Sequence, residues 1–266
     1  GSAARHGDVG RCGAGGVGQG DVGAGDGLAL GSVDGRCVGE LDVLARYAGD
    51  PVAAVGDWGS LWQRWWAGAP GVAAGDEPWS AGKPVGEWRQ APPQLGAWER
   101  WGVPALADFN GMVWYRTTIE LTAAQAAQDA VLALGPADEI DITWVNGRAV
   151  GSTYGAGPGR EYALPPGLLR AGTNTVVVNV LDTYREGGLA GPASLHRIRF
   201  ADGSEVALDR GWRWRAEPDA PTPPRAPWQT ASGLSTLHNG MIAPLGELPM
   251  KGALWYQGES NTFEHD

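Results

Sequence analysis

Hydrophobic residues recur at helical spacing in the first third of the chain. Apolar positions three or four residues apart predict one helix that includes Leu41, Leu44, Ala45 and Ala48. A second helix is predicted to begin after Asp57, whose side chain would cap its first turn. The large apolar side chains of that helix fall mostly on one face: Trp58, Leu61, Trp62, Trp65 and Trp66. The second helix is therefore predicted to pack through an aromatic face.

Alternating apolar and polar residues in the middle of the chain predict a series of short strands. These segments, rich in β-branched and aromatic residues, are 112–121, 130–134, 140–145, 175–181, 194–200 and 211–215. Asn146-Gly147 lies between two apolar segments and predicts a type I′ hairpin turn. Asp202-Gly203 predicts a second hairpin turn. Strands with turns at this spacing predict a β-sandwich of the jelly-roll type.

Composition sets two other segments apart. Residues 1–39 are rich in Gly, nearly free of aromatic residues and without periodicity. They are interpreted either as a flexible N-terminal segment or as GC-rich DNA translated in a wrong reading frame. The two cysteines, Cys12 and Cys37, lie in this segment and match neither a disulfide framework nor a metal-site spacing. Residues 219–227 are rich in Pro and predict a linker.

The charge of the chain argues against two classes of partner. The net charge is −10 and the isoelectric point is about 4.9. Nucleic acids and anionic membrane surfaces are bound by basic surfaces, so neither is expected as a partner. No apolar run reaches the roughly 18 residues that would insert across a bilayer. Residues 1–10 show no signal-peptide pattern.

Trp is unusually frequent, with 14 residues in the chain. A stripe of Trp at helical spacing is more typical of packing than of a sugar-binding platform, whereas a Trp on a loop beside a cleft can stack on a pyranose ring. In the predicted sandwich, Trp144, Tyr154 and the loop at residues 182–184 are candidates for contact with a sugar. A core position for Trp144 and an ordinary turn for the loop are the favoured alternatives. His196 lies in a predicted strand, where a structural role is expected.

Two blocks near the end of the sequence carry a family resemblance. Lys251-Gly-Ala-Leu-Trp-Tyr-Gln-Gly-Glu-Ser-Asn261 follows His238-Asn-Gly-Met-Ile-Ala-Pro-Leu245, and together they closely resemble sialate O-acetylesterases of the SGNH (GDSL-like) hydrolase superfamily. Phe109-Asn-Gly-Met-Val-Trp-Tyr-Arg116 and Trp144-Val-Asn-Gly147 resemble the galactose-binding-like β-sandwich that many members carry as an insertion. The resemblance implies an α/β plus β fold: a partial SGNH-type α/β hydrolase domain with an inserted jelly-roll β-sandwich.

With this resemblance the chain divides into five regions. Residues 1–39 form the irregular segment, and residues 40–108 form a helical, Trp-rich part of the hydrolase domain. Residues 109–216 form the sandwich insert, and residues 217–230 form a Pro-rich linker. Residues 231–266 return to the hydrolase domain.

The resemblance also implies a set of site residues. Gly258 would offer a backbone N–H, and Asn261 a side-chain amide, to the oxyanion formed from an acetyl ester. Glu259 would orient a catalytic histidine. Gln257 and Asn239 would contact the substrate. The resemblance implies no metal and no cofactor.

The two other catalytic blocks of that family are not found in the sequence. Gly18-Gln-Gly-Asp21 is the closest match to the Gly-Gln-Ser-Asn nucleophile block, but it has no serine. The sequence reaches Asp266 without the Asp-x-x-His block that supplies the base. We therefore expect a fragment with weak or no activity.

Three functions are consistent with these observations. The main interpretation is a carbohydrate O-acetylesterase, a serine hydrolase that removes acetyl groups from sialic acid or a similar sugar. Its partner would be an acetylated carbohydrate, and the resemblance implies a secreted or periplasmic protein. The alternative is a carbohydrate-binding β-sandwich module with vestigial hydrolase flanks. A third interpretation, a glycoside hydrolase accessory domain, predicts paired carboxylates on later strands, and the block at residues 257–261 argues against it.

Overall fold

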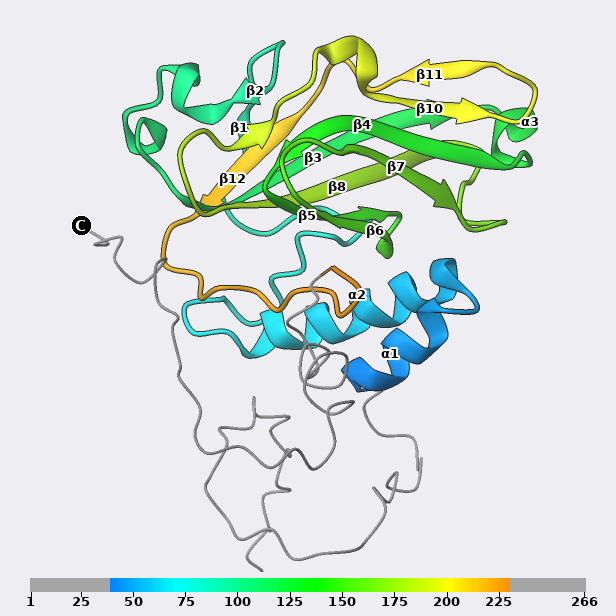
Figure 1. Ribbon diagram of the computed structural model, residues 1–266. Helices are drawn as coiled ribbons and strands as arrows, with labels where there is room; N and C mark the ends of the chain where they lie inside the picture. The colour runs from blue at the N-terminus through cyan, green and yellow to red at the C-terminus, as the bar shows by residue number, and fades with distance from the viewer. Residues whose placement is uncertain (1–38, 230–266) are drawn as a thin grey trace, which may run out of the picture. The chain divides into compact units, whose positions relative to one another are not determined.

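The computed structural model describes residues 39–229. Figure 1 shows two helices that lie against one face of a β-sandwich. The helices are α1 (Glu40–Tyr47) and α2 (Pro51–Gly68).

The second helix begins earlier than the sequence analysis expects. The Asp50 carboxylate accepts a 3.0 Å hydrogen bond from Ala53 N, and Pro51 occupies the first turn. Both are strong signals for a helix start. The predicted start at Asp57 is therefore wrong. Asp57 lies inside α2 and forms a 3.0 Å ion pair with Arg46 of α1.

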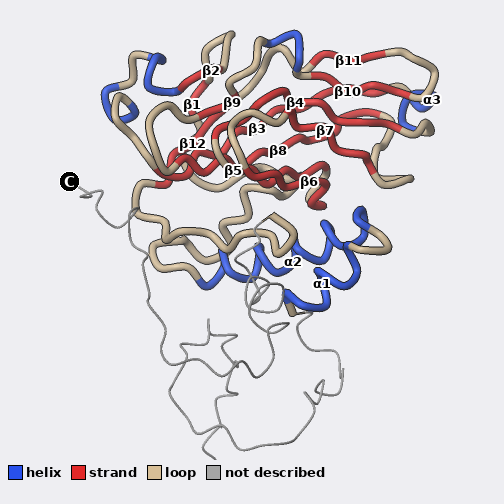
Figure 2. The backbone as a smooth tube through the Cα atoms, viewed as in Figure 1, coloured by secondary structure: helices blue, strands red, loops and turns tan. Residues whose placement is uncertain are grey.

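The strands of the described part form two antiparallel sheets (Figure 2). Their bounds are β1 (Arg89–Gln90), β2 (Gly96–Ala97), β3 (Gly111–Leu121), β4 (Ala130–Asp138), β5 (Ile140–Val145), β6 (Arg148–Tyr154), β7 (Gly159–Leu164), β8 (Gly172–Asp182), β9 (Gly188–Leu189), β10 (Arg197–Phe200), β11 (Glu205–Ala207) and β12 (Arg213–Glu217). The first sheet has the order β1-β12-β3-β8-β5-β6. The second has the order β11-β10-β4-β9-β2, with β7 also paired to β4.

Four short helical segments connect some of these strands. They are α3 (Ala123–Ala126) and the 3₁₀ segments η1 (Trp98–Trp101), η2 (Pro104–Leu106) and η3 (Ala193–Leu195). The capping box at Thr122 and Gln125 explains why so short a helix as α3 forms after β3.

The structure confirms the predicted sandwich and its main strands. Residues 112–121 lie in β3, and residues 140–145 form β5. The turn between β5 and β6 has φ values of 50° at Asn146 and 87° at Gly147, as the predicted type I′ turn requires. Strand β7 is missed by the sequence analysis because Arg160 occupies an inward-facing position and breaks the apolar alternation.

The core between the sheets is built from alternate residues of both. Its fully buried members include Val113, Tyr115, Leu132, Leu134, Val178, Val180 and Ile198. Because inward and outward residues alternate along each strand, the neighbouring residues of β3 and β8 face the opposite side, toward the helices.

A tryptophan cluster fills the space between α2 and the outer face of the first sheet. Its members are Trp58, Trp62, Trp66, Trp79, Trp114 and Trp144. The Trp62 ring centroid lies 5.5 Å from that of Trp114 and 5.3 Å from that of Trp144, with edge-to-face geometry. Trp144 is fully buried. The structure thus confirms that the Trp stripe serves packing and that Trp144 belongs to the core.

The segment after β12 returns along α2 without forming a helix or strand, as the trace in Figure 1 shows. Trp228 stacks on Tyr47 of α1 with ring centroids 4.4 Å apart. The Gln229 side chain donates a 2.7 Å hydrogen bond to Ser152 of β6. These contacts fasten the helices to the sandwich.

Residues 39–229 contain no α/β hydrolase domain, because their sheets are antiparallel and their long helix covers a sandwich. That part of the expected fold class is therefore unsupported, and residues 231–266 lie outside the described residues. The five region boundaries remain predictions. Strands β1 and β2 fall in the region assigned to the hydrolase domain, yet they pair with β12 and β9 of the sandwich. In the described residues, no helix is long and apolar enough to cross a bilayer.

Candidate functional site

The two most exposed aromatic side chains of the described part lie at one end of the first sheet. Tyr154 is the last residue of β6 and is 46% exposed, and Tyr184 follows β8 and is 63% exposed. Ile140, the first residue of β5, pairs with Tyr154 on one side and with Leu181 on the other. The ends of β6 and β8 are therefore level and about 10 Å apart. We call this end, together with the loop of residues 183–187, the loop end.

Three carboxylates from different elements hold the 183–187 loop. Asp182 accepts a 2.8 Å hydrogen bond from the backbone N–H of Tyr184. Glu139 accepts hydrogen bonds from Thr183, one of them a 3.1 Å bond from its backbone N–H. Glu99 of η1 accepts a 3.2 Å bond from the backbone N–H of Gly187. The loop is therefore fixed before any ligand binds, which lowers the entropic cost of binding.

Close packing fixes the far end of the same loop. The Trp98 indole lies against Gly187, and a Cβ atom on that residue would lie 2.1 Å from Trp98 Cζ2. Trp98 also donates from its backbone N–H to Gly187 O over 3.0 Å. The guanidinium of Arg100 forms a two-point ion pair with Glu186. Glycine at position 187 is thus required by the close approach of an aromatic ring.

Several carboxylates lie close enough at the loop end to raise one another's pKa values. Asp182 is 1% exposed, and its Oδ2 atom has no hydrogen-bond partner among the described residues. Burial raises the pKa of Asp182 to about 6, against the opposing effect of the Tyr184 N–H. The charges of Asp138, Glu99 and Glu139 raise this pKa further. Burial, followed by the charge on Glu139, also raises the pKa of Asp138.

A buried ion pair supports the Tyr154 side of the loop end. Arg160 Nε lies 3.0 Å from Asp141 Oδ1, and both side chains are fully buried. The same guanidinium donates hydrogen bonds to the carbonyl oxygens of Gly155, Pro158 and Glu139. Asp141 and Arg160 thus join β5 to the loop after β6, and their polar atoms are used within the fold.

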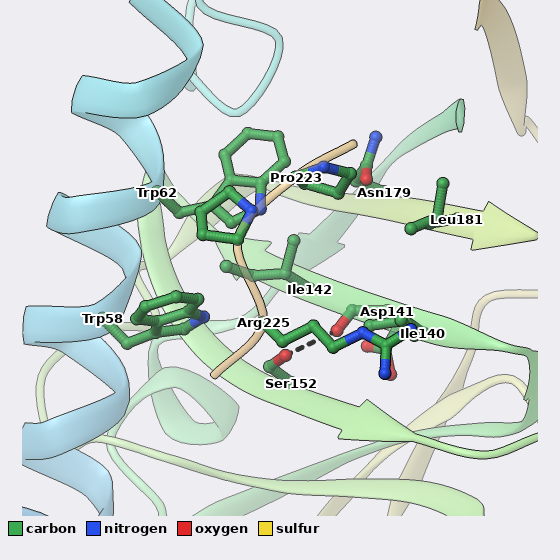
Figure 3. Close-up of a pocket in the computed structure, with 11 residues that line it drawn as sticks. Trp58, Trp62, Ile140, Asp141, Ile142, Ser152, Asn179, Leu181, Pro223 and Arg225 are labelled. Carbon is green, nitrogen blue, oxygen red and sulfur yellow. Dashed lines mark hydrogen bonds between the residues drawn. The ribbon is translucent and has the colours of Figure 1, made fainter. Parts of the chain in front are cut away.

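The pocket shown in Figure 3 is too small to bind a sugar. It lies where Trp58 and Trp62 of α2 face Ile142 and Asn179 of the first sheet, and Arg225 covers it. Its volume is about 10 Å³, which is room for at most one water molecule. The buried Asn179 amide nitrogen lacks a partner among the described residues, so a single water there would satisfy it.

A larger pocket lies beside β12. Its volume is about 210 Å³, and Phe109, Leu106, Trp214 and Arg89 are among the residues that line it. The Arg89 guanidinium lies 5.6 Å from the centre of the Trp214 ring. Phe109 also packs against Gly111, the partner of Asp182 in the β3–β8 ladder, so this pocket adjoins the loop end.

The five site residues implied by the family resemblance lie outside the described residues: Gln257, Gly258, Glu259, Asn261 and Asn239. The structure therefore does not test them. His196 is 1% exposed, and burial lowers its pKa to about 4. In the part of the chain that the structure describes, no group of three or more His, Cys, Asp or Glu side chains is placed to hold a metal ion.

The loop end combines two features that the sequence separates. Tyr154 and the 182–184 loop are both candidates for sugar contact in the sequence, and the structure brings them to the same end of the sheet. Glu99 and Glu139 are not candidates in the sequence. No local pattern marks them, because their contacts with the loop depend on the folding of distant segments.

Residues 112–174 match a family model described as the galactose-binding domain of beta-galactosidase. The matched stretch runs from β3 to the start of β8. It supports a galactose-binding-like domain of the kind found in glycoside hydrolases. The interpretation as a sialate O-acetylesterase, and as a carboxylic ester hydrolase in general, is therefore wrong. The motifs at 109–116 and 144–147 specify a strand and a hairpin of this sandwich, and they carry no ester chemistry of their own.

Three glycoside hydrolases are among the solved structures that resemble this chain. The β-glucuronidase of Faecalibacterium prausnitzii is 25% identical, and 40% of this chain aligns with 17% of that chain at a TM-score of 0.31. A glycosyl hydrolase family 2 member from Bacteroides cellulosilyticus DSM 14838 is 20% identical, with coverages of 42% and 17% and a TM-score of 0.37. A family 2 β-galacturonidase from Eisenbergiella tayi is 19% identical, with coverages of 51% and 21% and a TM-score of 0.32.

The aligned part spans about a fifth of each of these three proteins. No curated protein matches the chain.

Proposed function

We propose that the sandwich is a non-catalytic carbohydrate-binding domain that recognises a galactose-type sugar. The observation that carries the proposal is the match of residues 112–174 to the galactose-binding domain of beta-galactosidase. This stretch forms β3 to β7 and enters β8, and it includes the central strands β3, β8 and β4. The proposal agrees with two interpretations of the sequence. One is the carbohydrate-binding β-sandwich module, and the other is the glycoside hydrolase accessory domain.

The loop end is the proposed binding surface. Sugars are recognised by an aromatic face together with hydrogen-bonding groups in fixed positions. Tyr184 offers an exposed ring, and the Arg185 guanidinium lies 4.8 Å from the ring centre. Glu139 and Asp138 are half-buried beside the loop and offer carboxylate oxygens to sugar hydroxyls.

Calorimetric titration of the full chain with galactose tests the proposal. Saturable binding is expected, and Tyr184→Ala should weaken it at least about tenfold because the stacking surface is lost. Leu41→Ala is the matched control, since Leu41 is an equally exposed apolar residue on α1. Absence of heat with galactose and related neutral galactosides would contradict the proposed function.

A variant in the pocket beside β12 tests whether the sugar binds there instead of at the loop end. Phe109→Ala enlarges that pocket and removes no side chain that hydrogen-bonds the 183–187 loop. Under the proposal it changes galactose affinity less than Tyr184→Ala does. If Phe109→Ala abolishes binding and Tyr184→Ala has no effect, the sugar binds beside β12 and the proposed surface is wrong.

A further inference from the structure

Negatively charged side chains outnumber positively charged ones at the loop end. Five carboxylates gather there: Glu99, Asp138, Glu139, Asp182 and Glu186. Three arginines belong to the same surface. Arg100 is paired with Glu186, Arg185 lies over the Tyr184 ring, and Arg225 lies over the Tyr154 ring. The charge of Arg160 lowers the pKa of Asp138, but the Arg160 guanidinium is already paired with Asp141.

Asp182 is the least compensated of these charges. Its side chain is 1% exposed, and Oδ1 accepts the Tyr184 N–H. Oδ2 has no partner among the described residues. Buried polar atoms in proteins are nearly always hydrogen-bonded, so an unpartnered carboxylate oxygen at the end of a strand indicates a position where a donor is missing. A neutral hydroxyl group or a water can act as such a donor, whereas an ionised carboxylate cannot.

The same charges act against an anionic ligand. Exposed charges within a Debye length, about 8 Å at physiological ionic strength, still interact appreciably. A carboxylate on a sugar stacked at Tyr184 would lie beside Asp182 and Glu139, since both bind the backbone of residues 183 and 184. Arg185 lies over the Tyr184 ring, and Arg225 lies 5.0 Å from the centre of the Tyr154 ring. These two cations can offset part of this repulsion without leaving Glu186 unpaired.

We propose that the carboxylates around Asp182 make the loop end select uncharged sugars and reject uronic acids. The inference rests on the proposed carbohydrate-binding function. Galactose and galacturonic acid are the appropriate pair of ligands, because they differ only in whether carbon 6 belongs to a hydroxymethyl group or to a carboxylate. Discrimination between them therefore reports the charge at the site.

Titration of the full chain with methyl galactoside and methyl galacturonoside tests the inference. At pH 7.5 and low salt, the uncharged ligand is expected to bind at least tenfold more tightly. Added salt should reduce this ratio, because it screens the repulsion. Asp182→Asn and Asp138→Asn should each reduce it as well. Asp182→Asn keeps the oxygen that accepts the Tyr184 N–H.

Asp129→Asn is the control for these variants. Asp129 precedes β4 at the strand end opposite Asp138, about 30 Å away, so this substitution should leave the ratio unchanged. Equal or tighter binding of the galacturonoside would overturn the charge selection and leave the binding function standing. If neither ligand binds, the proposed function and this inference both fail.

Discussion

At the scale of one residue, the buried charge of Asp182 lowers the stability of the folded protein at neutral pH. Its pKa is raised to about 6 by burial, so the carboxyl binds its proton more tightly in the folded than in the unfolded protein. This group therefore stabilises the fold less as the pH rises from about 4 to about 6. His196 acts in the opposite direction, because burial lowers its pKa to about 4 and its contribution to stability falls as the pH drops below about 6.5.

Replacing Asp182 by Asn should stabilise the protein at neutral pH. The substitution removes a buried charge and keeps the acceptor for the Tyr184 N–H. We expect the free energy of unfolding to rise by about 1 kcal/mol at pH 7.5 and to change little at pH 4, where the wild-type carboxyl is protonated. Urea unfolding at both pH values measures this.

The difference between variant and wild type isolates Asp182, because His196 contributes equally to both. The stability that the variant gains over the wild type should grow as the pH rises from about 4 to about 6 and stay constant above that range. A loss of stability at pH 7.5, or the same change at both pH values, would show that the Asp182 charge is well compensated in the folded protein.

At the scale of elements, the contact of α2 with the first sheet depends on one glycine. Gly59 is buried where α2 meets β6, and a Cβ atom there would lie 2.2 Å from the Ala149 Cβ. The approach of the two backbones brings the tryptophan cluster together. Gly68, the last residue of the same helix, has no atom within 4 Å of the corresponding position.

Gly59→Ala should therefore destabilise the protein, whereas Gly68→Ala should not. We expect a loss of about 1–3 kcal/mol for Gly59→Ala, because the added methyl group overpacks the interface. For Gly68→Ala we expect no loss, or a gain of up to about 1 kcal/mol from reduced backbone entropy. Thermal unfolding of both variants checks this pair. Equal effects at the two positions would show that the helix can shift on the sheet without cost.

The strands and helices also differ in how well the sequence predicts them. Strands β3 and β5 and the Asn146-Gly147 turn follow from alternation and turn chemistry, which are local properties. The sequence analysis places the start of α2 too late, because Asp57 and Asp50 are both good caps and the Pro after Asp50 decides between them. It does not predict strand β7, because Arg160 faces inward, where only its distant partner Asp141 makes a charge tolerable.

At the scale of the whole molecule, the sandwich could be predicted and the enzyme class could not. The motifs that suggest an acetylesterase include a strand and a hairpin that also occur in the matched galactose-binding domain. The loop end could not be predicted as a unit. Glu99, Glu139 and Asp182 are far apart in the chain, and only the strand register places their carboxylates around one loop.

An NMR titration of the full chain with galactose tests the central claim most directly. The backbone amides of Thr183, Tyr184 and Gly187 donate to the three carboxylates of the loop end. Carbohydrate binding there predicts saturable shifts of these amide resonances, with the amide of Asp129 at the opposite end of β4 unchanged. No shift at saturating galactose, or shifts confined to residues away from the loop end, would contradict the account.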